Sequence, residues 1–78
     1  MKVYLVLVNN FESDFKGKHY FTYTFIERQT MKIINYTSET KLEYSLGDTL
    51  LCKIGTKLKN KEQVLCVEEV IEKYEENK

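Results

Sequence analysis

Residues 47–72 read GDTLLCKIGTKLKNKEQVLCVEEVIE, and this stretch predicts a β-hairpin with a basic turn. Gly47-Asp48 is a turn signal, after which residues 49–54 form an apolar strand. Residues 63–67 are rich in Val and Leu, as a buried strand is expected to be. Asn60 is the expected turn former between the two strands. We therefore expect a buried hairpin that carries positive charge at its tip.

Three further strands are predicted before this hairpin. Residues 2–8 are apolar on both parities, which predicts a central strand covered on both faces. Residues 9–18 predict a polar loop, in which Gly17 would let the backbone approach a ligand closely. Residues 19–26 and 31–37 predict two strands joined by a tight turn at 27–30. If that turn is symmetric about residues 28 and 29, the facing pairs are Phe25–Lys32, Tyr23–Ile34 and Phe21–Tyr36.

Two short helices are also expected. Thr40 and Glu43 form a capping box and Gly47 stands where a helix C′ glycine belongs, although the alternation of residues 42, 44 and 46 would suit a strand instead. Near the end of the chain, Val67 and residues 70, 71 and 74 recur at helical spacing, so the last strand is expected to run into a terminal helix.

Five strands with a helix between the third and fourth predict an all-β fold with short helical segments. The expected architecture is a small five-stranded OB-type barrel, with an SH3-like barrel as the alternative. The chain has 78 residues, so we expect one domain over residues 1–72 with a thin core, followed by a frayed acidic tail over 73–78.

The formal net charge is zero but unevenly spread. Residues 1–66 hold ten Lys/Arg and seven Asp/Glu (+3), and residues 67–78 hold two Lys and five Glu (−3). The acidic end is either a solvated segment or a tail that competes with an anionic ligand or recruits a protein partner. Neither a signal peptide nor a membrane span is recognisable, so a cytoplasmic protein without membrane contact is expected.

Cysteine and histidine usage argues against an enzyme. Cys52 and Cys66 would sit opposite each other if the hairpin turn centres on Lys59, and we expect small core residues rather than a disulfide. They have no neighbouring His or Cys that would complete a zinc site, and no other metal or cofactor is expected. His19 is the only histidine, and no triad spacing accompanies it.

Tyrosines and basic residues provide the candidate site. Tyr20, Tyr23 and Tyr36 either belong to the core or form a platform that stacks unpaired bases. The loops that flank the binding face of an OB barrel would carry lysines, and further cations come from the second and third strands. The basic candidates are Lys16, Lys18, Arg28, Lys32, Lys57, Lys59 and Lys61. Alternatively, lysines at hairpin tips keep the chain soluble and blunt the sheet edges.

The sequence Gly17-Lys18-His19-Tyr20 at the entry to an aromatic strand, together with the last hairpin over residues 47–71, resembles a known family. These are the small OB-fold single-stranded-DNA-binding proteins of phages and mobile elements, including the filamentous-phage type. The resemblance implies a cooperative or dimeric binder of unpaired DNA, with Tyr20, Tyr23 or Tyr36 as stacking residues. The zero net charge and the acidic end depart from that pattern.

Our first hypothesis is therefore a single-stranded nucleic-acid-binding module, with DNA favoured. The alternative is a small phage-type regulator or inhibitor of a host protein that binds no nucleic acid. A thin core also favours a homodimer that pairs through an edge strand.

Overall fold

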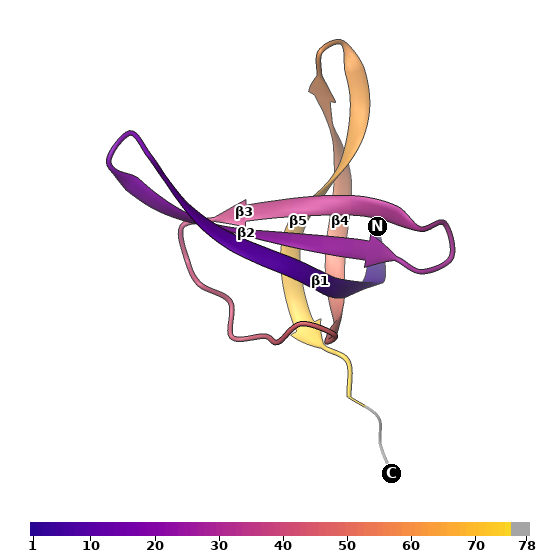
Figure 1. Cartoon of the computed structure of the whole chain (residues 1–78). Helices are drawn as coiled ribbons and strands as arrows, with labels where there is room; N and C mark the ends of the chain where they lie inside the picture. Colours follow the sequence, from indigo (N-terminus) through magenta and orange to yellow (C-terminus); the bar gives the residue numbers. More distant parts are fainter. Residues whose placement is uncertain (76–78) are drawn as a thin grey trace.

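The computed structural model of the chain describes residues 1–75 and contains five β-strands, with no helix in that range. This confirms the all-β prediction. The strands are β1 Lys2–Phe15, β2 Lys18–Glu27, β3 Lys32–Ser38, β4 Thr49–Lys59 and β5 Glu62–Lys73 (Figure 1).

All five strands belong to one antiparallel sheet with the order β3-β2-β1-β4-β5. β3 and β5 stand at opposite ends of that order, yet they lie close together. Within residues 1–75 no hydrogen-bonded ladder joins these two strands. The sheet therefore curls around its core and leaves the seam between β3 and β5 open.

The core lies on the concave face of the curled sheet. Leu5, Leu7 and Phe25 are completely buried at its centre. The buried apolar residues among those described are Leu5, Leu7, Tyr23, Phe25, Ile34, Leu50, Cys52, Ile54 and Val67. These side chains come from all five strands at alternating positions, as expected for a sheet with one buried face. Nine residues make a small core, in line with the length of the chain.

β1 is longer than predicted, and the polar loop expected at residues 9–18 is wrong. Asn9 to Phe15 pair with β2 down to a two-residue turn at Lys16-Gly17. Both turn residues have positive φ (52° and 80°), as in the type I′ turns that match the twist of a hairpin. A bulge between Leu7 and Asn9 reverses which parity faces the core. This reversal concealed the strand, because the alternation breaks in its middle.

The helix expected at residues 40–47 is also wrong. Tertiary contacts hold this segment as an irregular connection. The backbone N–H of Leu42 donates to the Tyr23 hydroxyl at 2.7 Å, and Leu42 and Tyr44 pack against the core. The backbone N–H of Gly47, whose φ is 95°, donates to the carbonyl of Leu7 at 2.8 Å. Bonds to β1 and β2 thus replace those of the expected helix.

The terminal helix is wrong for a different reason. β5 continues as a strand to Lys73 and contains two irregularities in its pairing with β4. Ile54 faces Val67 and Cys52 faces Val70, so one extra residue separates the two valines on the same face. A bulge in a strand thereby produced the three-residue spacing that had suggested a helix.

The registers of two hairpins differ from expectation. In β2–β3 the pairs are Tyr23–Tyr36 and Phe25–Ile34, two residues away from the symmetric turn, so each side chain keeps its face. The Glu27 carboxylate closes that turn. It accepts hydrogen bonds from the Thr30 hydroxyl and from the backbone N–H groups of residues 29 and 30, which lower its pKa.

The β4–β5 turn lies at Asn60-Lys61, which confirms Asn60 as turn former. The cysteines are consequently not opposite each other, because Cys66 faces Gly55. Both are free thiols. Cys52 is a core residue, and burial raises the pKa of its thiol to about 11.

The boundary expected after residue 72 falls inside β5. Lys73 lies 3.6 Å from Asp48, the Tyr74 N–H donates to the Thr49 carbonyl at 2.8 Å, and the Tyr74 ring meets Tyr4 edge-on at 5.4 Å. The end of the predicted tail, residues 76–78, lies outside the described residues. No helix within residues 1–75 is long and apolar enough to cross a membrane.

Candidate nucleic-acid interface

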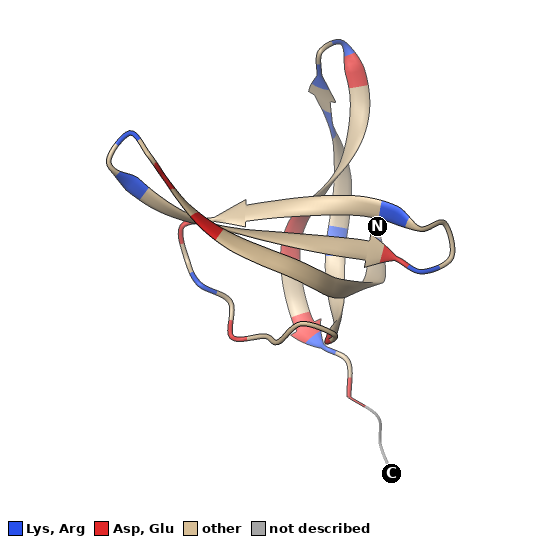
Figure 2. Cartoon of the chain, in the orientation of Figure 1, with Lys and Arg blue, Asp and Glu red and all other residues tan. Residues whose placement is uncertain are grey.

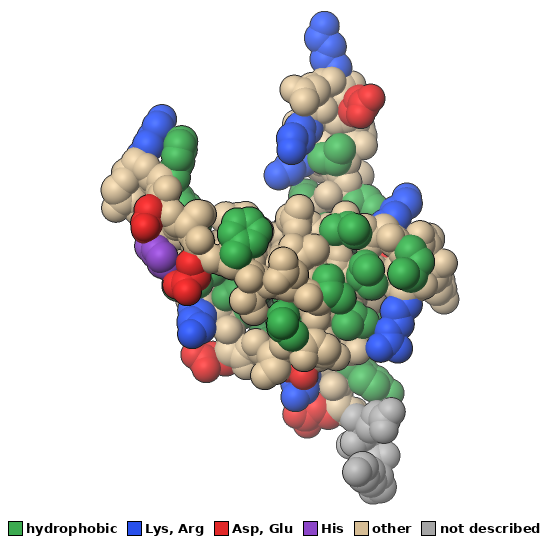
Figure 3. Space-filling model, in the orientation of Figure 1, with side chains coloured by type: hydrophobic (Ala, Val, Ile, Leu, Met, Phe, Trp, Pro, Cys, Tyr) green, Lys and Arg blue, Asp and Glu red, His purple; other side chains and the backbone are tan. Residues whose placement is uncertain are grey.

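Two hairpin arms project separately from the body of the molecule (Figures 1 and 3). One consists of the distal halves of β1 and β2, and we call it the β1–β2 arm (residues 9–24). The other consists of the distal halves of β4 and β5, and we call it the β4–β5 arm (residues 55–66). Both arms end in basic residues (Figure 2). They carry most of the residues predicted to hold phosphate.

The tip of the β1–β2 arm combines cations with exposed aromatic rings. Lys16 occupies the turn, with its Nζ atom 5.3 Å from the centroid of the Phe15 ring. Lys18 opens β2 and lies 3.6 Å from the Glu39 carboxylate. Both partners of that ion pair are largely exposed, so it is worth less than about 1 kcal/mol and leaves Lys18 available.

The outer face of this arm carries aromatic residues that the sequence reasoning missed. Beyond the bulge, Phe11 pairs with Thr22 and Ser13 with Tyr20, so Phe11, Phe15 and Tyr20 share the face turned away from the core. Phe11 is 53% exposed and Phe15 is 63% exposed. The even spacing of Phe11 and Phe15 within a polar stretch could have revealed that they share a face, had the stretch been interpreted as a strand.

His19 lies on the other face of the same arm, between two carboxylates. Its Nε2 is 2.8 Å from Glu12 Oε1 and its Nδ1 is 2.7 Å from Asp14 Oδ1. Two acceptors favour the doubly protonated ring, so the hydrogen bonds to Glu12 and then Asp14 raise the pKa of His19. The acidic side chains of the arm therefore lie on the inner side, opposite the exposed aromatic rings.

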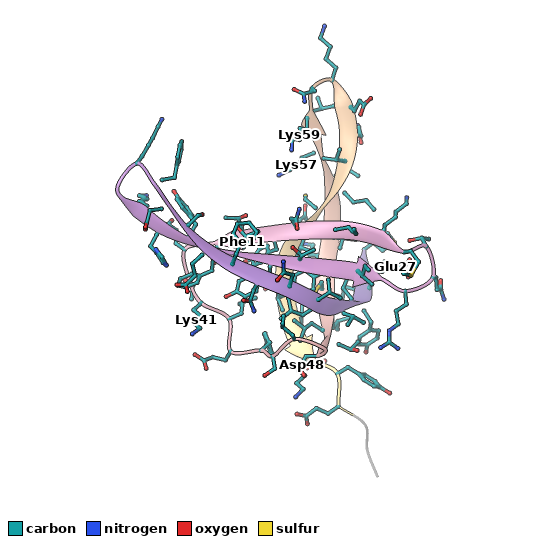
Figure 4. The ribbon with its side chains drawn as sticks, viewed as in Figure 1. Phe11, Glu27, Lys41, Asp48, Lys57 and Lys59 are labelled. Atoms are coloured by element: carbon teal, nitrogen blue, oxygen red, sulfur yellow. The ribbon has the colours of Figure 1, made fainter. Side chains whose placement is uncertain are left out.

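The β4–β5 arm carries three of the predicted lysines. Lys57 and Lys59 occupy alternate positions of β4 and so share one face, opposite Val64 and Glu62 of β5. Figure 4 shows both side chains extending toward the side of the molecule on which the β1–β2 arm lies. Lys61 is in the turn itself, with φ of 67°.

Arg28 and Lys32 are not part of this arrangement. They flank the β2–β3 turn, at the opposite end of β2 from the β1–β2 tip (Figures 1 and 2). The structure therefore divides the predicted basic residues into two lysine-bearing arms and a separate end.

The three predicted stacking tyrosines do not share a surface. Tyr23 is only 3% exposed and its hydroxyl is bonded to Leu42, which makes it a core residue. Tyr36 faces it across the β2–β3 ladder and packs half-buried against the core. Only Tyr20 lies on the outer face, beside the exposed phenylalanines.

Comparison of the chain with protein-family models, curated proteins and solved structures finds no match.

Proposed function

We propose that the chain is a cytoplasmic single-stranded nucleic-acid-binding module, with DNA favoured, built on an OB-type barrel. The strand order and the approach of β3 to β5 support this architecture. In this sheet β1 pairs with both β2 and β4, and an SH3-like barrel stays the alternative architecture. The connections β1–β2 and β4–β5 are the ones that flank the binding face of an OB barrel.

The observation that carries the proposal is that both projecting arms carry lysines and that the β1–β2 arm also carries aromatic rings on its outer face. Lysine side chains on both arms would hold successive phosphates, and Phe11, Phe15 and Tyr20 would stack unpaired bases. Stacking on an aromatic ring contributes about 1–3 kcal/mol per base and needs no base-specific hydrogen bond. Sequence preference should therefore be weak.

A net charge of zero does not argue against such binding, because a phosphate responds to the charged side chains near it and not to the net charge of the whole chain. The distal part of the β4–β5 arm holds Lys57, Lys59 and Lys61 against Glu62, a surplus of two positive charges. On the β1–β2 arm, Lys16 and Lys18 are balanced by Glu12 and Asp14, and these two carboxylates lie on the inner side and are hydrogen-bonded to His19. At physiological salt the screening length is about 8 Å, so phosphates at the arms experience nearby lysines more than the remote acidic end.

The proposal is tested by the salt dependence of binding to a labelled single-stranded oligonucleotide, measured by fluorescence anisotropy. Each lost phosphate contact reduces the slope of log K against log salt by about 0.7. The double variant Lys57→Gln/Lys59→Gln should reduce the slope by about 1.4. The matched control Arg28→Gln/Lys32→Gln removes the same charge from the far end and should leave the slope unchanged. Absence of wild-type binding at low salt, or equal effects of the two variants, would refute the proposal.

A second candidate function is that of a protein-binding regulator. It is favoured by a row of neighbouring apolar residues on the outer face of the sheet, which we call the apolar row (Val6, Ile26 and Ile33). Val6 pairs with Ile26 and Ile26 with Ile33, and Ile33 is 66% exposed. Figure 3 shows hydrophobic side chains gathered over this face of the molecule. A second copy of the chain is the simplest partner, since the neutral chain would not repel itself. A partner at the acidic C-terminal segment stays a prediction.

Sedimentation equilibrium tests self-association through this row, and the oligonucleotide titration above tests nucleic-acid binding separately. If the apolar row is an interface between copies, Ile33→Lys should give a monomer, and the control Leu58→Lys, at an exposed apolar residue of the β4–β5 arm, should not. A wild-type protein that stays monomeric at high concentration would argue against self-association through this row.

A further inference from the structure

A cavity of about 200 Å³ lies between the β1–β2 arm and the connection that follows β3. Asn10, Glu12 and Phe21 line it from the arm, and Lys41 and Tyr44 line it from the connection. Figure 4 labels Phe11 and Lys41 on these two elements; Phe11 also touches the cavity, although its pairing with Thr22 places it on the outer face of the arm. The bulge in β1 places Asn10 and Glu12 on this inner side of the arm.

The wall formed by residues 41–44 is attached to the body of the protein. The Leu42 N–H donates to the Tyr23 hydroxyl at 2.7 Å, and both Leu42 and Tyr44 pack against the core. The contacts that replace the expected helix at residues 40–47 therefore also hold this wall of the cavity in place. A preorganised wall avoids the entropic cost of ordering a loop when a ligand binds.

The lining combines ring surfaces with polar groups that can accept a ligand. Phe21 and Tyr44 provide aromatic surface. Asn10 and Lys41 are exposed residues, and within residues 1–75 neither side chain is engaged in a hydrogen bond or ion pair with the protein, so both can contact a ligand. An amide offers a donor and an acceptor side by side, which suits the polar edge of a heterocycle. An ammonium suits an adjacent phosphate.

The size of the cavity selects among heterocycles. A cavity of about 150 Å³ is sufficient to hold benzene. At about 200 Å³, this cavity, which is open to solvent on one side, matches one six-membered ring with its substituents better than a fused two-ring purine. We propose that it is a nucleotide site that takes one pyrimidine base, with the Asn10 amide at the polar edge of the base and Lys41 near its phosphate. The strand that supplies this base is the one held by the arms, so the inference rests on the proposed function.

The test measures the affinity of each variant for oligo-dT and for oligo-dA of equal length. The quantity compared between variants is the ratio of these two affinities, the dT/dA ratio. Single strands of dT are intrinsically more flexible, so the wild-type ratio alone does not identify the pocket. Loss of one stacking ring is worth about fivefold or more. Tyr44→Ala should therefore reduce the dT/dA ratio about fivefold, with the slope against salt unchanged. Asn10→Ala should reduce it as well while retaining both rings.

Leu46→Ala is the matched control, because Leu46 belongs to the same connection but is 57% exposed and does not line the cavity. Its ratio should equal that of the wild type. Circular dichroism establishes that each variant is folded; should Tyr44→Ala unfold, Asn10→Ala decides. Salt-dependent binding with the same ratio in the wild type and Asn10→Ala would overturn the pocket and leave the proposed function intact.

The pocket is also tested without an oligonucleotide. Titration of ¹⁵N-labelled protein with thymidine 5′-monophosphate should shift the backbone amide signals of Asn10, Lys41 and Tyr44, and deoxyadenosine 5′-monophosphate should shift them less. Absence of these shifts, or equal shifts with both nucleotides, would overturn the inference. Such shifts in a protein that binds no oligonucleotide at low salt would contradict only the proposed function.

Discussion

Replacing Lys61 with glycine should stabilise the protein and weaken its binding to nucleic acid at the same time. Asn60 and Lys61 form the two-residue turn of the β4–β5 arm, and both have positive φ (51° and 67°). Asn tolerates this conformation, but Lys has a Cβ that is strained there. Asn-Gly is the preferred pair for such a turn. The lysine at position 61 is therefore unfavourable for folding, and the phosphate contact we propose for it would explain its presence.

The size of the stability gain follows from two opposing effects. Removing the strain of an L-residue at positive φ contributes about 1–2 kcal/mol. The greater freedom of glycine in the unfolded chain costs about 0.4–1 kcal/mol. The net gain is about 0–1.6 kcal/mol, and its central value of about 0.8 kcal/mol raises the melting temperature of a domain this small by about 3–6 °C.

Thermal unfolding and oligonucleotide binding together test this prediction. Lys61→Gly should melt higher than the wild type, and its slope of log K against log salt should be smaller by about 0.7. Lys61→Ala is the control, because it removes the same charge but keeps a Cβ at positive φ. It should lose the same slope and gain no stability. Equal melting temperatures for the two variants would show that strain in this turn is not the cause.

Two further predictions concern single side chains. Tyr23→Phe removes the acceptor of the Leu42 N–H and should lower the free energy of unfolding in urea by about 1 kcal/mol. The control Tyr36→Phe should cost less, because the Tyr36 hydroxyl has no hydrogen-bond partner within residues 1–75. Equal losses in the two variants would contradict a stabilising role for the Tyr23–Leu42 bond. His19 has a raised pKa, so its contribution to stability is fully present below the ordinary value of 6.5 and is lost as the pH rises through the folded-state pKa. The difference in unfolding free energy between the wild type and His19→Gln should accordingly be larger at about pH 5 than at about pH 9. In an NMR titration, the pKa of His19 should be lower in Glu12→Gln than in the wild type. A His19 pKa unchanged by that substitution would refute the hydrogen bond to Glu12 as the cause of the raised pKa.

The hairpin at residues 47–72 shows how far local patterns determine the fold. An apolar strand, a turn former at Asn60 and a second apolar strand were all recognisable, and the structure contains them. Alternation also placed Phe21, Tyr23 and Phe25 on one face of the second strand, because a strand presents successive side chains to opposite sides, but only the structure shows that this face is buried. The two-residue error in the β2–β3 register left these faces unchanged, since it preserved parity.

The two helix errors have different causes: at residues 40–47 a local signal competed with a distant contact, and in β5 bulges imitated a helical spacing. The capping box at Thr40 and Glu43 is a genuine local preference, but a helix there would forgo the bond between Leu42 and Tyr23 and the packing of Tyr44 on the core. A short helix is marginal by itself, so tertiary contacts determine the outcome. In β5, bulges produced a spacing that a sequence pattern cannot distinguish from a helical turn.

The sequence alone determined that the chain is all-β, that its last hairpin carries lysines at the tip, and that aromatic residues fill the second strand. These features depend on residues close together in the chain. Only the tertiary structure decided which tyrosines are buried, that Phe11 and Phe15 are exposed, and that Arg28 and Lys32 lie away from the arms. A bulge reverses the two faces of a strand at the cost of one residue, and pairing between distant strands determines where that bulge falls.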